Sequence, residues 1–357
     1  MTTDYIIVGQ GLCGTFLSWN LKKAGKKIVV IDKQNPYSAT RVASGVINPV
    51  TGRRIVRTWE IEKLMPFAVN AYKELGNELG VSLIQQCNLL DFFNTPQMKL
   101  AFEDRLVTEK EYLRLPDNET HWYQYFNPTL GIGEIKPCWL IDLQAMLDGW
   151  RKKLIELDAL RDELFNMNDC RIFDDHVEYK DITAQKIFFC DGIEGLNNTY
   201  FKGLPYAPNK GEALIVSIPG LPAKNIYKQG ISIVPWKEDL FWVGSSFEWN
   251  FSDPNPTNAF REKTEQHLHQ WLKLPFETVE HFASVRPANV ERRPFVGFHP
   301  LHAATGILNG MGTKGCSLSP YFADELTQLL LNGSPINPLA DVGRFSKILS
   351  KNLNTKI

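Results

Sequence analysis

The stretch Tyr5-Ile6-Ile7-Val8-Gly9-Gln10-Gly11-Leu12-Cys13-Gly14 decides the fold, together with the residues that follow it to Asp32. A short apolar run stops at a glycine-rich turn, and a helical pattern then covers residues 15–24. A second apolar run, Ile28–Ile31, ends at Asp32. Strand, glycine turn, helix, strand and terminal acid is the order of a dinucleotide-binding βαβ unit. The sequence therefore predicts a nucleotide site here, although this unit alone does not separate FAD from NAD.

The residue types in this unit suit the binding of a pyrophosphate and a ribose. Gly9 permits the tight turn, Gly11 lets the backbone approach a pyrophosphate, and Gly14 lets the helix pack against the strands. The helix N-terminus offers N–H groups and a partial positive charge to phosphates. The carboxylate of Asp32 falls where it can accept hydrogen bonds from a ribose diol. The candidate cofactor-binding residues of this unit are Gly9, Gly11, Leu12, Cys13, Gly14, Asp32 and Lys33.

Length and composition favour a globular protein of two domains. A chain of 357 residues exceeds the usual single core. Its 43% hydrophobic and 22% charged residues are ordinary, and a net charge of -1 gives no global basic field for nucleic acid or an anionic membrane. No apolar run approaches the roughly eighteen residues that span a bilayer. Because the first strand begins by Tyr5, no room is left for a signal peptide, and we expect a cytoplasmic protein.

The cysteines and histidines do not predict a metal site. The six cysteines are scattered without a CxxC pair, which indicates neither a disulfide framework nor zinc. His267 and His269 lie two apart on a predicted helix and so point to different faces. Cys13 lies inside the glycine turn, where we interpret it as a small packing residue. The six are Cys13, Cys87, Cys138, Cys170, Cys190 and Cys316.

Patterns further along the chain predict two interleaved domains. Helical patterns follow at residues 61–79, 140–164, 258–274 and 321–331. Short apolar runs, aromatics and turns occupy residues 83–139, and strand patterns occupy residues 186–190 and 213–247.

A second glycine-rich turn between a strand and a helix recurs at Gly310–Gly315. We therefore expect an α/β fold with a Rossmann-like domain in discontinuous segments and an inserted, mostly antiparallel β substrate domain. The segments 1–82, 140–212 and 285–357 form the first domain. The segments 83–139 and 213–284 form the second.

Four blocks of this chain resemble the FAD-dependent superfamily of D-amino-acid oxidase, glycine oxidase and sarcosine oxidase. The resemblance runs nearly end to end and is densest in residues 4–54, 186–192 and 231–331. The opening βαβ unit resembles the superfamily's FAD-binding strand and helix. Ser44-Gly45 matches the small residues that let the chain pass the flavin, and Cys190-Asp191-Gly192 resembles the second cofactor turn. The segment from Ile233-Val234-Pro235 through Gly244-Ser245-Ser246 is similar to the superfamily's substrate-domain hairpin.

The closing block adds the candidate catalytic residues. Val285-Arg286-Pro287, then residues 293–297, then Gly310–Gly315 follow the superfamily's order. In related amine oxidases the arginine that matches Arg286 binds the substrate carboxylate, and a guanidinium fork suits two carboxylate oxygens. The resemblance places the final turn near the pyrimidine edge of the flavin, where the cation of Lys314 would stabilise the anionic reduced form. The resemblance thus implies Arg286 and Lys314 as catalytic residues, and as further cofactor contacts Ser44, Gly45, Asp191, Gly192, Gly310, Gly312, Thr313, Lys314 and Gly315.

Two departures refine what the resemblance implies. Covalently flavinylated sarcosine oxidases carry a cysteine near the position of Ser284, so we expect FAD to be bound noncovalently. Ser232 stands where D-amino-acid oxidases have an active-site tyrosine, which weakens a D-amino-acid assignment.

Two further groups of residues have two interpretations each. The aromatic residues of one group shape the pocket or belong to the core; they are Trp236, Trp242, Phe247 and Trp249. The basic residues of the other group form a solvated face or contact a phosphate or acidic substrate; they are Arg53, Arg54 and Arg57.

The resulting expectation is an FAD-dependent oxidoreductase acting on the CH–NH bond of a small amino acid or amine. Arg286 would orient a carboxylate so that hydride passes to the flavin, and the imine formed would be hydrolysed. No side-chain base is required, because positioning and preorganised electrostatics supply the rate. Oxygen or an electron carrier would reoxidise the flavin.

Four alternatives stay open from the sequence. Two are enzymes on the same fold: a 2-hydroxy-acid oxidoreductase, and a tRNA-modification oxidoreductase that would use the basic cluster. The third is a flavin-binding partner or redox sensor with little turnover. The fourth, an NAD-dependent dehydrogenase, would follow if the later blocks were coincidental.

Overall fold

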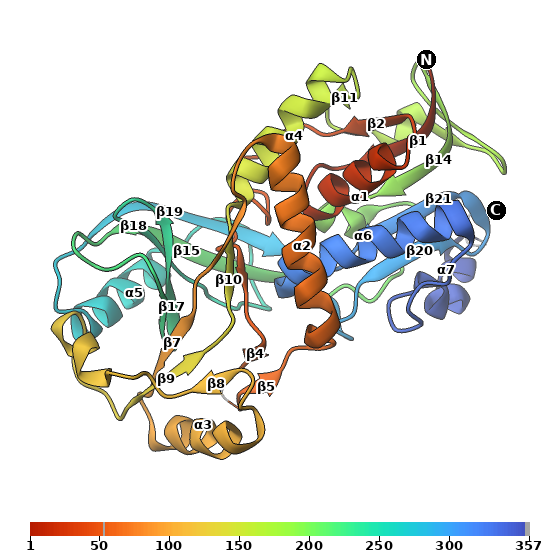
Figure 1. Cartoon of the computed structure of the whole chain (residues 1–357). Coiled ribbons are helices and arrows are strands. Elements are labelled where there is room, and N and C mark those ends of the chain that lie inside the picture. Colours follow the sequence, from red (N-terminus) through yellow and green to blue (C-terminus); the bar gives the residue numbers. More distant parts are fainter. Residues whose placement is uncertain (53, 354–357) are drawn as a thin grey trace.

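Two large β-sheets, each covered by helices, form two lobes in the computed structural model (Figure 1). The structure describes residues 1–52 and 54–353. The chain passes repeatedly between the lobes, so each sheet is assembled from segments far apart in the sequence.

The first sheet has the order β11-β2-β1-β14-β13-β12, with β21 beside β14 and β20 beside β21. The strands β11, β2, β1, β14 and β21 run parallel, as expected for a nucleotide-binding fold. Its strands are β1 Thr2–Val8, β2 Ile28–Ile31, β11 Leu160–Arg161, β12 Cys170–Ile172, β13 Val177–Tyr179, β14 Ile182–Phe189, β20 Phe295–His299 and β21 His302–Asn309.

Helices α1, α2, α4 and α6 pack together on this lobe (Figure 1). They bury aliphatic and aromatic side chains such as Phe16 of α1, Tyr72 of α2 and Phe322 of α6 in one core cluster. These helices are α1 Leu12–Lys23, α2 Ile61–Leu79, α4 Leu143–Glu156 and α6 Gly315–Asn332.

The second sheet has the order β19-β15-β18-β17-β16-β7-β9-β8 and is antiparallel except where β16 pairs with β7. One face packs on α5 (Asn258–Trp271) through residues such as Val243 and Trp271. Because side chains alternate along a strand, the other face is free to line a cavity. The strands are β7 Leu89–Phe92, β8 Leu113–Arg114, β9 Ile132–Ile135, β15 Asn209–Ser217, β16 Ile226–Gln229, β17 Ile231–Lys237, β18 Leu240–Gly244 and β19 Glu277–Arg286.

Smaller elements complete the structure. The remaining strands are β3 Val46–Ile47, β4 Val50–Thr51, β5 Val56–Arg57, β6 Ile84–Gln86 and β10 Trp139–Ile141. The remaining α-helices are α3 Pro96–Thr108 and α7 Ser346–Leu353, and the 3-10 helices are Glu119–Gln124, Met167–Asp169, Gly192–Asn197, Gly312–Lys314 and Val342–Phe345.

The predicted helix at residues 140–164 is wrong at both ends. The segment begins in β10, continues as α4 from Leu143 to Glu156, and ends in the short strand β11. Asp142 caps α4 by accepting a hydrogen bond from the N–H of Ala145 at 2.8 Å, and Asp158 has a positive φ of 51° just after the helix.

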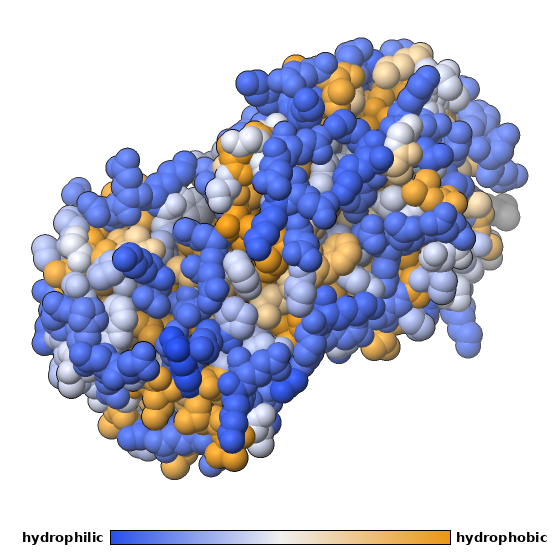
Figure 2. Space-filling model, in the orientation of Figure 1, coloured by the Kyte–Doolittle hydropathy of each residue, from blue (hydrophilic) through white to orange (hydrophobic). Residues whose placement is uncertain are grey.

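The face shown in Figure 2 is mostly hydrophilic, with hydrophobic residues gathered in small groups. Among the residues that the structure describes, no helix is both long and apolar enough to cross a membrane.

Candidate active site

A cavity of about 1440 Å³ extends between the two sheets. Ligand pockets commonly measure about 300–1,000 Å³, so this one has room for a dinucleotide and a substrate together. One end is lined by the turn after β1 and by Asp32, and the other by the free face of the second sheet. The cavity therefore joins the predicted nucleotide site to the predicted substrate domain.

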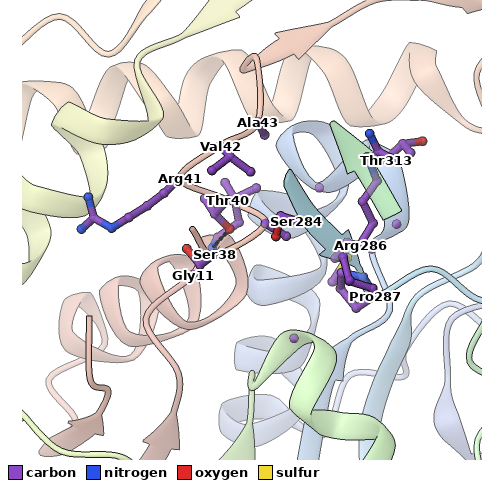
Figure 3. A pocket seen from close by; sticks show the side chains of 18 of the residues that line it. Gly11, Ser38, Thr40, Arg41, Val42, Ala43, Ser284, Arg286, Pro287 and Thr313 are labelled. Carbon is purple, nitrogen blue, oxygen red and sulfur yellow. Dashed lines mark hydrogen bonds between the residues drawn. The ribbon is translucent and has the colours of Figure 1, made fainter. Parts of the chain in front are cut away.

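The glycine turn after β1 brings the backbone of α1 against the first sheet. A Cβ on Gly14 would lie 1.8 Å from the carbonyl oxygen of Gly9, so no larger residue fits there. Gly9 itself has φ +95°, a conformation that favours glycine. The N–H of Leu12 donates to Oγ1 of Thr40 at 3.3 Å, which ties the turn to the loop at residues 38–43 (Figure 3). Gly11, Leu12 and Cys13, at the start of α1, line the cavity. A phosphate site requires a helix N-terminus placed in this way.

Asp32 lines the cavity at the end of β2 and is already hydrogen-bonded within the protein. Its Oδ2 accepts from the N–H of Gln10 at 2.9 Å, and its Oδ1 accepts from Nη1 of Arg151 at 2.9 Å. The side chain is 22% exposed, so a ligand can still reach it. Each carboxylate oxygen can accept more than one hydrogen bond, and these contacts leave capacity for a ribose.

Asp191 follows β14 and lines the cavity beside the first turn, since a Cβ on Gly9 would lie 3.3 Å from its Cα. Nδ2 of Asn309 donates to Oδ1 at 2.9 Å, and Nδ2 of Asn198 donates to Oδ2 at 3.3 Å. Burial raises the pKa of Asp191 to about 6, because desolvation disfavours the charged carboxylate.

The second glycine turn, after β21, places a cation in the cavity. Nζ of Lys314 donates to Oδ1 of Asn48 at 3.0 Å, and burial lowers the pKa of Lys314 to about 8. The ammonium is therefore still protonated for the most part at neutral pH. Within residues 1–52 and 54–353 it has no acidic partner.

Arg286 ends β19 in a cradle of neutral oxygen atoms. Its Nη1 donates to Oδ1 of Asn209 at 2.6 Å, and its Nη2 donates to Oγ of Ser245 at 2.8 Å. Both nitrogens also lie 3.3 Å from the carbonyl oxygen of Ser246. A Cβ on Gly211 would come within 1.8 Å of Nη2, so the guanidinium lies directly over that glycine.

Arg286 carries a charge that the described part of the protein does not neutralise. No carboxylate there pairs with it, and burial lowers the pKa of Arg286 to about 10. The side chain remains a cation at neutral pH despite this shift. A buried charge without an opposite charge is unfavourable, so the arrangement suits an anionic ligand. Figure 3 shows Arg286 beside Ser284 and Pro287, whereas Arg41 points away from this group and pairs with Asp148.

The cavity brings together most of the residues singled out from the sequence, and three glycines lie outside its lining. Gly14 serves the packing described above, a Cβ on Gly45 would lie 2.2 Å from the carbonyl oxygen of Ile141, and a Cβ on Gly310 would lie 2.8 Å from the ring of Phe295. The residues on its lining are Gly9, Gly11, Leu12, Cys13, Asp32, Lys33, Ser44, Asp191, Gly192, Arg286, Gly312, Thr313, Lys314 and Gly315.

The aromatic group divides between the cavity and other positions. Trp242 and Phe247 line the cavity, and Nε1 of Trp242 donates to the carbonyl oxygen of Val42 at 2.9 Å. Trp236 packs partly buried against the core, and Trp249 is 56% exposed.

The basic group is also divided. Arg54 lines the cavity. Arg57 forms ion pairs with Glu62 and, at 2.5 Å, with Glu109. Arg53 lies outside the described residues.

Several residues that support the site were not identified from the sequence. Arg151 belongs to α4 and reaches Asp32 across 119 positions, and Asn209 reaches Arg286 across 77. No local spacing could have indicated these pairs. Asn48 had a weaker local signal, because it follows the small residues Ser44-Gly45 by only a few positions.

A mostly parallel sheet with two glycine turns and a second, mostly antiparallel sheet thus line one large cavity. The chain belongs to the FAD dependent oxidoreductase family, which it matches over residues 4–329.

A curated relative and two solved structures show how similar known members are. The uncharacterized oxidoreductase YurR of Bacillus subtilis is 35% identical over 76 residues, which are 21% of this chain and 20% of that protein. The structure of iminodiacetate oxidase from Chelativorans sp. BNC1 has a TM-score of 0.75 and 19% identity, covering 93% of this chain and 96% of that one. The structure of glycine oxidase from Geobacillus kaustophilus has a TM-score of 0.78 and 15% identity, covering 95% and 98%. At these identities the two structures establish a shared fold.

Proposed function

We propose that this FAD-dependent oxidoreductase oxidises the CH–NH bond of a substrate that carries an amine and a carboxylate. The observation that supports the substrate class is the buried guanidinium of Arg286, which has no acidic partner among the described residues. An amino acid would supply the missing anion. The solved structures named above are those of enzymes titled as oxidases of iminodiacetate and glycine, which agrees with this class.

The residues that line the nucleotide end of the cavity fit FAD. The Gly9–Gly14 turn has the close backbone packing that a pyrophosphate site needs, and Asp32 is accessible to a ribose. Lys314 would lie near the flavin ring as a protonated amine. Ser284 carries a hydroxyl in place of a nucleophilic thiol, so we propose that the cofactor is held noncovalently. When bound, FAD supplies a two-electron acceptor for the substrate hydride.

The protein's own contribution is to bind and orient the substrate. Arg286 would hold the carboxylate through its planar pair of N–H donors, and Asn209 and Ser245 fix the direction of that pair. The charge of Lys314 would favour negative charge that develops in the cavity during oxidation. The imine product would be released to water and hydrolysed. None of these roles requires a side-chain base, and positioning is the main source of rate.

A 2-hydroxy acid is the second candidate substrate, because Arg286 would hold its carboxylate equally well. The two are separated by mixing the purified holoenzyme anaerobically with matched amino acids and 2-hydroxy acids and recording the flavin absorbance. We expect amino acids to bleach the flavin band and hydroxy acids of the same skeleton to leave it unchanged. Bleaching by hydroxy acids alone would contradict the proposal, and bleaching by neither would favour a flavin-binding protein with little turnover.

A further inference from the structure

Lys228 places a further cation on the cavity wall, outside the groups used above. It belongs to β16, lines the cavity and is 24% exposed. Its Nζ donates to Oδ2 of Asp91 on β7 at 2.8 Å. Asp91 is fully buried, and its Oδ1 has no hydrogen-bond partner. Burying the carboxylate of Asp91 costs free energy. A lysine whose only role was to face solvent would not require a buried acidic partner.

The strand register places Lys228 on the same face of the sheet as Arg286. Lys228 is opposite Ser232 on β17, which is opposite Gly244 on β18. The row continues through Ala213 on β15 to Phe282 on β19, four residues before Arg286. Because side chains alternate along a strand, Phe282 and Arg286 share a face, and both line the cavity.

Arg286 lies on the edge strand β19 of the substrate sheet, and Lys228 lies four strands away on β16. Four strand spacings of about 4.8 Å separate β16 from β19, and four residues along β19 add about 13 Å in the other direction. Nζ of Lys228 is held by Asp91 on β7, on the side of β16 away from β19, so the side chain of Lys228 does not shorten this gap. A ligand that touches both must therefore be extended, and longer than a common amino acid.

The wall between the cations suits such a ligand. Ser232 and Ala213 are small residues, and both line the cavity. The ring of Trp242 lies 2.7 Å from the position that a Cβ on Gly244 would take. It offers an apolar surface. The wall between Lys228 and Arg286 is thus formed by small residues and one aromatic ring.

We propose that Lys228 forms a second anion-binding subsite, and that the substrate carries a second carboxylate far from the one held by Arg286. This inference rests on the proposed function and specifies its substrate class. An ammonium has three N–H donors, and Asp91 takes one of them in the described structure. The other two donors remain for an acceptor in the cavity. Asp91 acts by fixing the position of the ammonium.

The test is the affinity of the holoenzyme for non-reacting acids, measured by isothermal titration calorimetry. Sebacate, dodecanedioate and hexadecanedioate are compared with decanoate, dodecanoate and hexadecanoate, so each diacid has a monoacid of equal length, and the longest diacid approaches the separation of the two cations. We expect at least one diacid to bind about tenfold to a hundredfold more tightly than its monoacid, as a charge-assisted hydrogen bond would give. Lys228→Met should remove this preference and leave monoacid binding nearly unchanged.

Control variants separate the subsite from a structural role. Lys224→Met removes an exposed lysine just before β16 and should preserve the diacid preference. Lys228→Met leaves Asp91 without its partner, so the double variant Asp91→Asn/Lys228→Met provides a neutral pair if the single variant does not fold. A diacid preference that persists in either Lys228 variant would overturn the proposal, as would its absence from the wild-type protein.

Arg286→Ala distinguishes failure of this inference from failure of the proposed function. If Arg286 anchors a carboxylate, the variant loses affinity for monoacids and diacids alike. If monoacid binding is unchanged in Arg286→Ala, the carboxylate anchor itself is wrong. If Arg286→Ala loses monoacid binding and Lys228→Met keeps the diacid preference, only the second subsite is wrong.

Discussion

At the scale of single residues, Asp32 shows how the cofactor turn is held in place. Its carboxylate accepts hydrogen bonds from the N–H of Gln10 in the turn and from Arg151 on α4, while one side stays open to the cavity. Arg151 has a second acid, Asp162, at 2.7 Å, whose side chain is 70% exposed. The two acids contact the same arginine, but only Asp32 lines the cavity.

Asp32→Ala should weaken FAD binding without unfolding the protein. Loss of a charge-assisted hydrogen bond is worth about 1.5–3 kcal/mol, or roughly a tenfold to hundredfold change in affinity. The measurement is fluorescence titration of FAD into protein from which the flavin has been released by mild acid. Asp162→Ala is the matched control, because it removes the other partner of Arg151. Equal FAD affinity in wild type and Asp32→Ala would show that Asp32 does not contact the cofactor, and flavin that stays with the denatured chain would contradict noncovalent binding.

At the scale of elements, the contact between α1 and the turn after β1 is set by glycine. The first βαβ unit was predicted correctly because its signals are local: two apolar runs, three glycines and a terminal acid. By contrast, α3 was not predicted, because Phe102 is its one buried residue and so it lacks an apolar stripe. β11 has two residues and exists through parallel pairing with β2, which no local pattern reveals.

Gly14→Ala should destabilise this contact. The added methyl group would lie 1.8 Å from the backbone oxygen of Gly9, which cannot rotate away as a side chain would. Overpacking of this kind costs about 1–3 kcal/mol, so the urea midpoint should fall and FAD affinity with it. Gly149→Ala, in α4, is the control, because its methyl group would meet only the flexible side chain of Leu79 at 3.1 Å. An unchanged urea midpoint in Gly14→Ala would show that α1 can move away from the turn.

At the scale of the whole molecule, the site exists because the two sheets contribute to one cavity. We propose that the sheets belong to the domains expected at residues 1–82, 140–212 and 285–357 and at 83–139 and 213–284. The residue types of the site were predictable, since glycine turns and Arg286 are recognisable in sequence. The cradle of Arg286 was not, because Asn209 and Ser245 reach it through strand pairing and a loop. The same topology brings Lys228 to the cavity from a strand without any recognisable motif.

The central claim, that Arg286 anchors a substrate carboxylate, is tested most directly by comparing an amino acid with its decarboxylated amine. The rate of anaerobic flavin reduction is measured for both substrates in wild type, Arg286→Ala, Arg286→Lys and the exposed control Arg261→Ala. Removing a buried charged contact should slow reduction by the amino acid at low concentration about a hundredfold or more, and leave the amine nearly unaffected. Arg286→Lys should recover part of the rate, since an ammonium lacks the planar fork. Equal losses for the amino acid and the amine in Arg286→Ala would contradict the account.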